Sequence, residues 1–305
     1  MQPAHEHGAI VVTGASGQIG SELCRLLRSA AGTIMPIDIN PDEMHGVVAC
    51  DLRRKQPVKE LFRRHSIHTV IHLAGALPSS FQADPLAGTD LNVNGTLTLL
   101  RQAIATGVRR FVFASSMSAY GTRETPRPLT EDDPAVPDDP YGVSKRVIEL
   151  VGEALADKRS IEFAALRICR VVGPGIRRSS SFWRSQICGT PQPKSILLPF
   201  CPQAKLSLVH VNDVAHMLMI LAEAGGMSRA VYNTPAEVWT AQQLKDVIEE
   251  MRGIPVALMQ GGPDGGPICD GSRFAREFGF QIRLLRQYFA AGAGLTSSAR
   301  LLPNL

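Results

Sequence analysis

Residues 9–27 constrain the fold more than any other stretch, because they join an apolar strand to a helix through a glycine-rich turn. Residues 9–12 are apolar, residues 13–20 contain three glycines, and apolar side chains then recur at helical spacing as far as residue 27. A strand, a glycine turn and a helix in this order form the first half of a unit that binds the phosphates of a dinucleotide. The spacing is G-x-x-G-x-x-G, so the prediction gains its strength from the residues that follow.

Each glycine of the turn has its own expected role. Gly14 permits the tight turn, Gly17 lets a pyrophosphate approach the backbone, and Gly20 lets the helix pack on the strand. The N-terminus of the helix offers N–H groups and partial positive charge to the phosphates. The residues expected to bind the cofactor at this turn are Gly14, Ser16, Gly17, Gln18, Ile19 and Gly20.

Asp38 ends the second predicted strand, residues 33–38, about 20 residues beyond the glycine turn. A carboxylate in this position binds the hydroxyl groups of the adenosine ribose. It would repel a 2′-phosphate, and neither Ser16 nor Ile39 is a basic residue that could compensate. The sequence therefore favours NAD over NADP.

Short apolar strands alternate with amphipathic helices as far as residue 166. One strand, residues 69–73, contains His72, which we expect to be a buried, hydrogen-bonded strand residue, and is followed by small residues that would let the cofactor lie close over the sheet. The alternation predicts an α/β fold of the Rossmann type, a doubly wound parallel sheet with helices on both faces. We expect residues 1–175 to form the cofactor-binding domain and residues 176–305 a smaller substrate-facing lobe interleaved with it.

Tyr141 and Lys145 are four residues apart in a predicted helix, which puts both side chains on one face. A phenol has a pKa of about 10, so it is a poor base at neutral pH unless a cation stabilises its phenolate. The lysine ammonium is such a cation. The pair therefore indicates a proton donor and acceptor, as hydride transfer at a carbinol carbon requires.

Composition excludes several classes of protein. With 305 residues, 44% hydrophobic and 20% charged, the chain is an ordinary globular one, and its net charge of +4 with scattered basic doublets such as Arg109-Arg110 does not indicate nucleic-acid binding. Most of these doublets are expected to be solvated. The six cysteines have no metal-ligand spacing and are expected to be reduced thiols, so we predict no metal site. No apolar run approaches the roughly 20 residues of a membrane helix, and we expect a cytoplasmic protein.

Taken together, these features resemble the extended short-chain dehydrogenase/reductase family, of the NAD-dependent epimerase/dehydratase type. The motifs follow the family's order over most of the chain and are specific only jointly. They are the turn at 13–20, Asp38, Asp51-Leu52, residues 73–76, residues 92–96, Ser115-Ser116, Tyr120-Gly121, Tyr141 with Lys145, Leu166-Arg167, residues 173–175 and residues 210–215.

The resemblance implies a role for each matching residue. Tyr141 would be the catalytic acid/base, Lys145 would lower its pKa and hold the nicotinamide ribose, and Ser116 would hydrogen-bond the reacting oxygen, with Ser115 as the alternative. It also implies a homodimer built from the helices over residues 94–106 and 141–157. Further cofactor contacts are implied for Asp51 and Leu52 at the adenine, and for Leu73, Ala74, Gly75 and Asn92.

Departures from the family pattern bear on the substrate. Met117, expected beside the substrate, and Ser118 stand where dehydratases of the family carry an acidic pair, so no general acid is in place to eliminate water. Arg170 replaces an Asn of the sugar-nucleotide epimerases, and Leu206 stands where they place a diphosphate-binding Arg. A nucleotide-sugar substrate thus loses two of its usual anchors.

Arginines near this region suit a different substrate. Arg170, Arg177 and Arg178 lie close in sequence to three serines, residues 179–181. A guanidinium pairs with a carboxylate through two parallel hydrogen bonds, and hydroxyl groups suit a polyol chain. Arg170 and Arg177 are therefore predicted to bind a sugar acid or small hydroxy acid, although Arg177 and Arg178 could equally be solvated loop residues.

Three functions follow from these residues. The leading one is an NAD-dependent oxidoreductase that transfers hydride at a secondary alcohol of a sugar, sugar acid or small hydroxy acid. The second is a sugar or nucleotide-sugar epimerase that retains its NAD. The third is a dinucleotide-sensing protein without catalysis, and it ranks last because both Tyr141 and Lys145 are present.

Overall fold

A computed structural model of the chain describes residues 8–30, 32–122, 125–158, 160–176, 181–189, 192–263 and 265–292. The chain divides into two compact units. Unit 1 consists of Met1–Cys169, Val211–Pro235 and Pro267–Gln281, and unit 2 consists of Arg170–His210, Ala236–Gly266 and Ile282–Leu305. The chain therefore returns twice to unit 1 after residue 175, where the sequence analysis placed the boundary.

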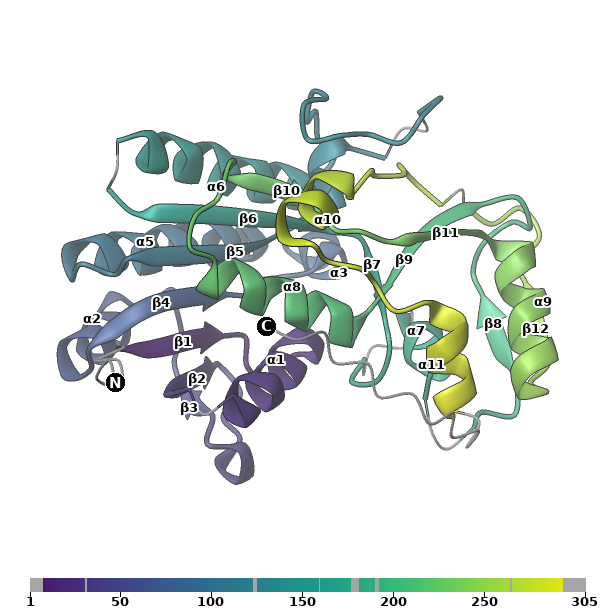
Figure 1. The fold of residues 1–305 in the computed structure, drawn as a ribbon, viewed down its shortest axis with the longest axis horizontal. Coiled ribbons are helices and arrows are strands. Elements are labelled where there is room, and N and C mark those ends of the chain that lie inside the picture. The colour runs from purple at the N-terminus through teal and green to yellow at the C-terminus, as the bar shows by residue number, and fades with distance from the viewer. Residues whose placement is uncertain are drawn as a thin grey trace. The chain divides into compact units, whose positions relative to one another are not determined.

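Unit 1 is built on a parallel sheet, which confirms the predicted Rossmann-type α/β fold (Figure 1). In the described part of the chain this sheet has seven strands, all paired in parallel. Their order is β10 (Val231–Asn233), β6 (Glu162–Ile168), β5 (Arg110–Ser116), β4 (Ile67–His72), β1 (Ala9–Thr13), β2 (Ile34–Asp38) and β3 (Val48–Ala49). The order reverses between β1 and β4, and ligands of such sheets bind at the carboxyl ends of the strands at this point.

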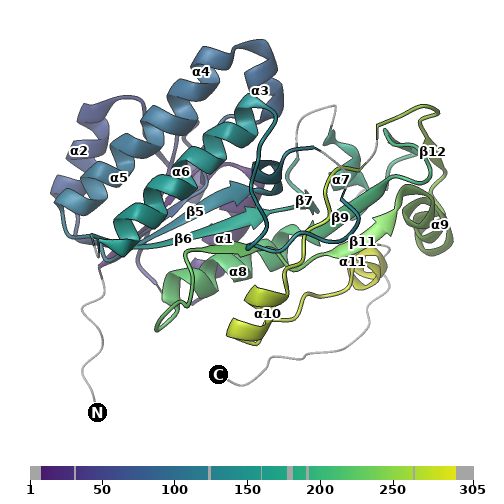
Figure 2. The same cartoon turned by 90° about the horizontal axis from the view of Figure 1, so that it is seen from above.

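Helices cover both faces of the sheet, as Figure 2 shows. Helices α2 (Lys55–Arg64), α5 (Thr96–Ala105) and α6 (Pro140–Asp157) lie on one face, and α1 (Gln18–Ser29) and α8 (Val211–Glu223) on the other. The main core forms between the sheet and the first three helices, where Phe62, Leu99 and Ile148 meet Phe111 and Phe163. Because both faces are covered, most side chains of β1, β4, β5 and β6 are buried.

The helical segment that leads into α5 begins before residue 94, where the sequence analysis started its helix. After α3 (Pro78–Ala83), Asp84 caps α4 (Pro85–Thr89) by accepting hydrogen bonds from two backbone N–H groups. The chain then passes without a break through η2 (Asp90–Gly95), a π-helical segment, into α5. Such π-turns often occur at functional sites.

Buried charges brace the sheet of unit 1. Arg110, predicted to be solvated with most of the basic doublets, is instead buried at the start of β5. Its guanidinium donates to Glu162 and to the carbonyl oxygens of Leu221, Ala222 and Ala224, so it caps the C-terminal end of α8. The prediction of exposure was wrong here because these carbonyl groups come from a helix more than 100 residues away in sequence.

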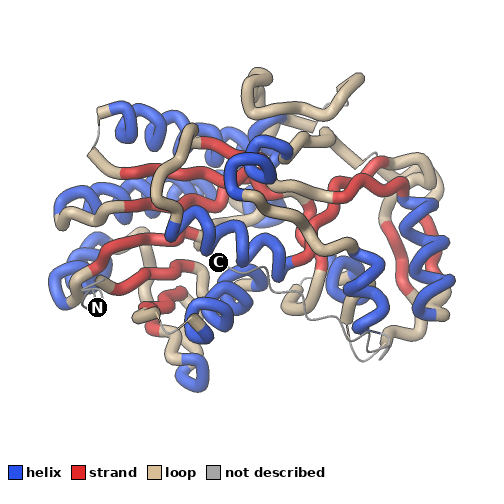
Figure 3. Tube along the Cα trace, in the orientation of Figure 1, coloured by secondary structure: helices blue, strands red, loops and turns tan. Residues whose placement is uncertain are grey.

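Unit 2 contains short strands and helices, which Figure 3 distinguishes by colour. One sheet has the order β11 (Glu237–Thr240), β9 (Lys205–His210) and β7 (Arg170–Val172), and a second pairs β12 (Val256–Leu258) with β8 (Ile196–Leu198). Its core packs Leu206 and Leu208 against Leu244 and Ile248 of α9 (Ala241–Arg252). Helices α7 (Trp183–Gln186) and α11 (Leu285–Gly292) complete the described part of this unit.

Candidate active site

The glycine turn between β1 and α1 leaves no room for side chains. Gly14 has a φ of +69°, and a Cβ built on it would lie 2.7 Å from the backbone nitrogen of Ala74. A Cβ on Gly20 would lie 2.1 Å from the carbonyl oxygen of Gly14. The N–H of Gly17 donates to that same oxygen at 3.0 Å. The turn is therefore as compact as a phosphate-binding turn must be, at the point where the strand order reverses.

The N-terminus of α1 suits an anion. Gly17 is its N-cap, no side chain caps the helix, and its first turn carries no acidic residue. Helices that lack such groups present backbone N–H groups and the positive end of the helix dipole to a bound phosphate. The residues here therefore fit the pyrophosphate of a dinucleotide.

Asp38 reaches the turn from the end of β2. Its carboxylate accepts hydrogen bonds from the N–H of Ser16 at 3.1 Å and the N–H of Asn40 at 2.9 Å. The Ser16 hydroxyl donates to the carbonyl oxygen of Asn40. These contacts fix the carboxylate beside the glycine turn.

Asp51 and Leu52, which the resemblance puts at the adenine, differ in their surroundings. The Asp51 carboxylate accepts two hydrogen bonds from the Arg53 guanidinium, at 2.9 and 2.8 Å. This pairing holds the pKa of Asp51 below its usual value. The Leu52 side chain is buried in the main core of unit 1.

The segment after β4 is held in place by Asn92. The amide of Asn92 accepts from the N–H of Ala76 at 2.7 Å and donates to the carbonyl oxygen of Ala76 at 3.2 Å. A Cβ on Gly75 would lie 3.1 Å from the Asn92 amide oxygen and 3.6 Å from Lys145 Nζ. This arrangement brings Gly75 and Asn92, both predicted to contact the cofactor, close to Lys145. Leu73 and Ala74, which directly precede Gly75, are bound to Thr13 beside the glycine turn.

Lys145 is a buried ammonium on the sheet-facing side of α6, 6% exposed. Its Nζ donates to the carbonyl oxygen of Ala114 at 2.8 Å and lies 4.8 Å from the centre of the Phe113 ring. Burial lowers the pKa of Lys145 to about 8, and the charge of Glu149, one turn further along the helix, opposes this shift. The side chain is therefore still charged at neutral pH.

Tyr141 lies in the first turn of α6, which is tightly fixed. Asp139 caps the helix by accepting from the N–H groups of Tyr141 and Gly142, at 2.8 and 3.0 Å. A Cβ on Gly142 would lie 2.3 Å from the carbonyl oxygen of Ser118. The start of α6 thus packs on the backbone of η3 (Met117–Tyr120), and Lys145 Nζ is 5.7 Å from the centre of the Tyr141 ring.

The hydroxyl groups of Ser115 and Ser116 have different hydrogen-bond partners. The Ser115 hydroxyl donates to Glu149 at 2.5 Å and is buried in the contact between the sheet and α6. Ser116 caps η3: its hydroxyl oxygen accepts from the N–H of Ser118, and its O–H donates to the Ser118 hydroxyl at 3.2 Å. Ser116 and Met117 therefore adjoin the segment on which the Tyr141 helix begins.

Glu149 is a residue that the sequence analysis missed. It is 0% exposed and accepts from Ser115, from Arg146 and, through two nitrogens, from Arg167. Arg167 also stacks on the ring of Tyr120 at 4.5 Å. The spacing of Tyr141, Lys145 and Glu149, each four residues apart, was the available signal, and Asp139 before Pro140 was the signal for the cap.

Arg170 and Leu206, which bear on the substrate, both belong to unit 2. Two nitrogens of the Arg170 guanidinium donate to the carbonyl oxygen of Gly265 at 3.2 Å, and the group lies 5.0 Å from the centre of the Phe200 ring. Leu206 is 0% exposed in the core of unit 2 and has no polar surface to offer. Arg177 and Arg178 lie outside the described residues.

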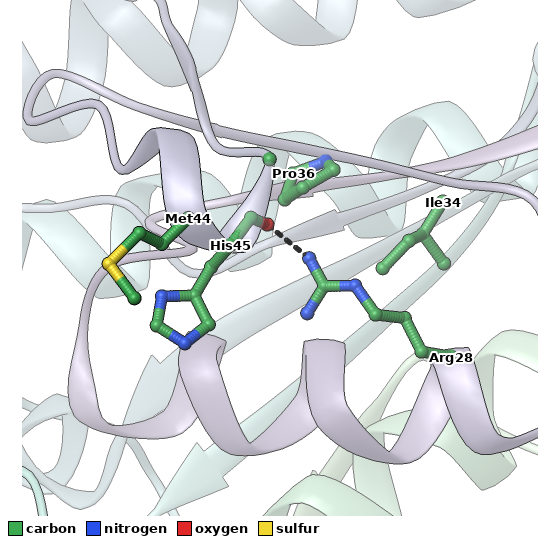
Figure 4. Close-up of a pocket in the computed structure, with 6 residues that line it drawn as sticks. Arg28, Ile34, Pro36, Met44 and His45 are labelled. Atoms are coloured by element: carbon green, nitrogen blue, oxygen red, sulfur yellow. Dashed lines mark hydrogen bonds between the residues drawn. The ribbon is translucent and has the colours of Figure 1, made fainter.

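A surface pocket of about 490 Å³ adjoins α1 at its other end (Figure 4). Arg28, Ile34, Pro36, Met44, His45 and Gly46 line it, and Arg28 donates to the carbonyl oxygen of His45. None of the candidate site residues lines this pocket. Among the described residues, no group of three or more His, Cys, Asp or Glu side chains is arranged to hold a metal, and no helix has the length and apolar character to cross a bilayer.

Comparisons with known proteins agree on one family. The model of the NAD dependent epimerase/dehydratase family matches residues 10–234. A UDP-glucose 4-epimerase from Halalkalibacterium halodurans is 31% identical over 173 residues, which are 54% of this chain and 51% of that protein. The chain thus spans about half the length of this curated relative.

Solved structures match over nearly the whole chain. MoeE5 in complex with UDP-glucose and NAD is 28% identical, with a TM-score of 0.80, and the match covers 94% of this chain and 98% of that one. L-threonine dehydrogenase from Clostridium difficile has a TM-score of 0.84 at 21% identity, covering 95% and 98% of the two chains. The second likeness concerns the fold alone.

The buried charge of Lys145 predicts a pH-dependent stability. Below a pH of about 8 the side chain is protonated in both states, and burial of the ammonium lowers the free energy of unfolding. As the pH rises toward 10.5, folded Lys145 loses its proton before the unfolded chain does, so this loss of stability is relieved. Relative to Lys145→Met, the wild-type protein should gain at most about 3 kcal/mol over this range.

Urea unfolding of both proteins below pH 8 and near pH 10.5 measures this difference. Lys158→Met is the matched control, because Lys158 is exposed at the C-terminal end of the same helix and keeps its hydration. If the difference in the free energy of unfolding between the wild-type protein and Lys145→Met stays constant with pH, the prediction of a buried ammonium is wrong.

Proposed function

Because the chain belongs to the NAD dependent epimerase/dehydratase family, we propose that it is an NAD-dependent oxidoreductase acting on a secondary alcohol of a sugar, sugar acid or small hydroxy acid. One observation carries the proposal: a buried ammonium, Lys145, lies one turn from Tyr141 and beneath the glycine-containing segment that follows β4. A cation has a high desolvation cost in such a place, so a partner that needs the positive charge is expected there.

The residues around the turn fit NAD. The backbone of Gly14 to Gly20 and the N-terminus of α1 would hold the pyrophosphate, and Asp38 would hold the adenosine ribose. Gly75 leaves space above Lys145, whose ammonium would hold the nicotinamide ribose. When bound, NAD supplies the hydride acceptor.

The protein's own residues would move the proton. Tyr141 as phenolate removes the proton of the substrate hydroxyl, and the ammonium of Lys145 stabilises the phenolate. Ser116 donates a hydrogen bond to the same oxygen. Asp139 and Gly142 support this role, because the helix cap and the close contact with η3 restrict the position of Tyr141.

Three departures from the family pattern support this substrate class. Met117 and Ser118 provide no acidic group to eliminate water. The buried Leu206 offers nothing to a diphosphate, whereas the Arg170 guanidinium, which donates to the carbonyl oxygen of Gly265, supplies a positive charge that attracts a carboxylate. We therefore favour a free sugar acid or hydroxy acid, with Arg170 as its anchor and Arg177 as a second one.

A sugar epimerase is the alternative, and the similarity to a UDP-glucose 4-epimerase and to MoeE5 supports it. Such an enzyme would oxidise the substrate transiently and return the hydride to its other face. The two functions differ in a measurable way, because a dehydrogenase releases NADH and an epimerase does not.

The decisive experiment is a substrate screen with a matched variant. Sugars, aldonic and uronic acids and nucleotide sugars are incubated with the protein and NAD, and the absorbance of NADH is followed. We expect an acid without a nucleotide to give NADH, and Tyr141→Phe to reduce turnover of that substrate about 100- to 10,000-fold while NAD still binds.

Tyr232→Phe is the control, because the Tyr232 phenol binds Glu277 and is not part of the candidate site. Turnover by Tyr141→Phe at the wild-type rate would refute the proposed acid/base. Interconversion of nucleotide sugars without release of NADH would establish the alternative function instead.

Cofactor preference tests Asp38. In Asp38→Ala the repulsion of a 2′-phosphate is removed and a ribose contact is lost, so the ratio of NAD to NADP affinity should fall about tenfold, or about 1.4 kcal/mol. Isothermal titration with each cofactor measures the ratio. Asp42→Ala is the control, since the Asp42 carboxylate pairs with His45. An unchanged ratio in Asp38→Ala would exclude a role at the ribose.

We also propose that the protein is a homodimer formed by the helices over residues 94–106 and 141–157. The half-exposed Val143 and Leu150 on α6 support an apolar contact there. Light scattering should give the mass of a dimer, and Leu150→Glu should give a monomer because it puts a charge into the contact. Met44→Glu, at an exposed residue of η1 (Glu43–His45), is the control. A monomeric wild-type protein would reject the proposal.

A further inference from the structure

His72 is a histidine whose two ring nitrogens both have partners inside unit 1. The side chain is 1% exposed and its ring lies 5.8 Å from the ring centres of Phe111 and Phe113. Nδ1 is 2.7 Å from the hydroxyl of Thr13, and Nε2 is 2.8 Å from the hydroxyl of Thr96. An imidazole with two fixed partners has one preferred tautomer.

The neighbouring hydrogen bonds determine that tautomer. The Thr96 hydroxyl donates to the carbonyl oxygen of Asn92 at 2.6 Å, so it accepts from Nε2–H of His72. The Thr13 oxygen accepts from the N–H groups of Leu73 and Ala74, both at 3.1 Å, so its own hydrogen is donated to Nδ1. In this series of hydrogen bonds, from Thr13 through His72 to Thr96, only the neutral Nε2–H tautomer of His72 gives every hydrogen an acceptor. Burial, together with the charge of Lys145, lowers the pKa of His72 to about 3.

The series links two parts of the candidate site. At one end, Thr13 directly precedes Gly14 and holds the segment that follows β4. At the other end, Thr96 binds the backbone of Asn92, whose side-chain amide donates to the hydroxyl of Ser144 at 3.1 Å. The Ser144 hydroxyl in turn donates to the carbonyl oxygen of Tyr141 at 2.7 Å.

We propose that His72 is a positioning residue: its Nδ1 side aligns the phosphate-binding turn, and its Nε2 side aligns the helix that carries Tyr141. This inference rests on the proposed function. It assigns the two nitrogens to two separable properties, cofactor affinity and turnover.

Three substitutions separate these properties. In His72→Asn the amide oxygen can replace Nδ1 as acceptor for Thr13, but nothing reaches Thr96. In His72→Gln the amide nitrogen can replace Nε2 as donor to Thr96, while the bond to Thr13 is lost. We expect His72→Asn to bind NAD normally and to lose about tenfold in kcat, and His72→Gln to show the reverse. His72→Phe should lose both properties.

Thr96→Val provides a second approach if a His72 variant fails to fold. It removes the acceptor for Nε2–H while keeping the shape of the side chain, and it should lower kcat with NAD affinity unchanged. His68→Phe is the matched control, because His68 lies on the same strand and its Nδ1 contacts Thr69. Titration calorimetry gives the NAD affinity, and steady-state assays with the substrate from the screen give kcat.

Nitrogen NMR of the histidine-labelled wild-type protein tests the tautomer without any assay of activity. His72 should give the Nε2–H form and should not titrate between about pH 5 and pH 8. An Nδ1–H tautomer, or equal losses of affinity and turnover in His72→Asn and His72→Gln, would overturn the inference. If the wild-type protein does not bind NAD at all, the proposed function fails, whereas the NMR result still decides the tautomer.

Discussion

The candidate site depends on keeping one ammonium charged in a place where water hardly reaches it. Lys145 is 6% exposed, and a buried cation without compensation would lose its proton. Its surroundings supply the compensation: the carbonyl oxygen of Ala114, the face of the Phe113 ring, and the carboxylate of Glu149 one turn away. A protonated His72 would add a second positive charge beside Lys145, but burial and the charge of Lys145 lower the pKa of His72 and keep it neutral. The surroundings of Lys145 therefore accommodate its own positive charge but not a second one on His72.

The helix that carries Lys145 is fixed from its N-terminal cap to Glu149 by contacts of different kinds. Asp139 caps it, Gly142 lets it approach η3, and Glu149 binds it to Arg167 of β6. Breaking a buried pair such as Glu149 with Arg167 typically costs 3–5 kcal/mol, because a charge is left without its partner. This pair orders the helix and also binds the Ser115 hydroxyl, whereas the Ser116 hydroxyl at the end of β5 contacts Ser118.

Local patterns in the sequence predicted much of this structure. The strand, turn and helix at residues 9–29, Asp38 at a strand end and the helix of Tyr141 and Lys145 are all where periodicity and spacing put them, and the family match confirms the resemblance. What could not be predicted depends on contacts between distant segments. The burial of Arg110 needs carbonyl groups from α8, the Glu149 pair needs Arg167, and β10 joins the main sheet only because the chain returns after residue 210.

Substrate specificity cannot be deduced from the fold, because proteins with the same fold catalyse different reactions with different residues. The position of Leu206 illustrates this. Its side chain packs with Leu208 and Leu244 in the core of unit 2, so an arginine there would have to bury a guanidinium among apolar side chains. Replacing Leu206 alone would therefore place a guanidinium in this core and disturb the packing of unit 2. Arg170, in the same unit, has its guanidinium on the Phe200 ring and the carbonyl oxygen of Gly265, and we propose this positive charge as the anchor of a carboxylate substrate.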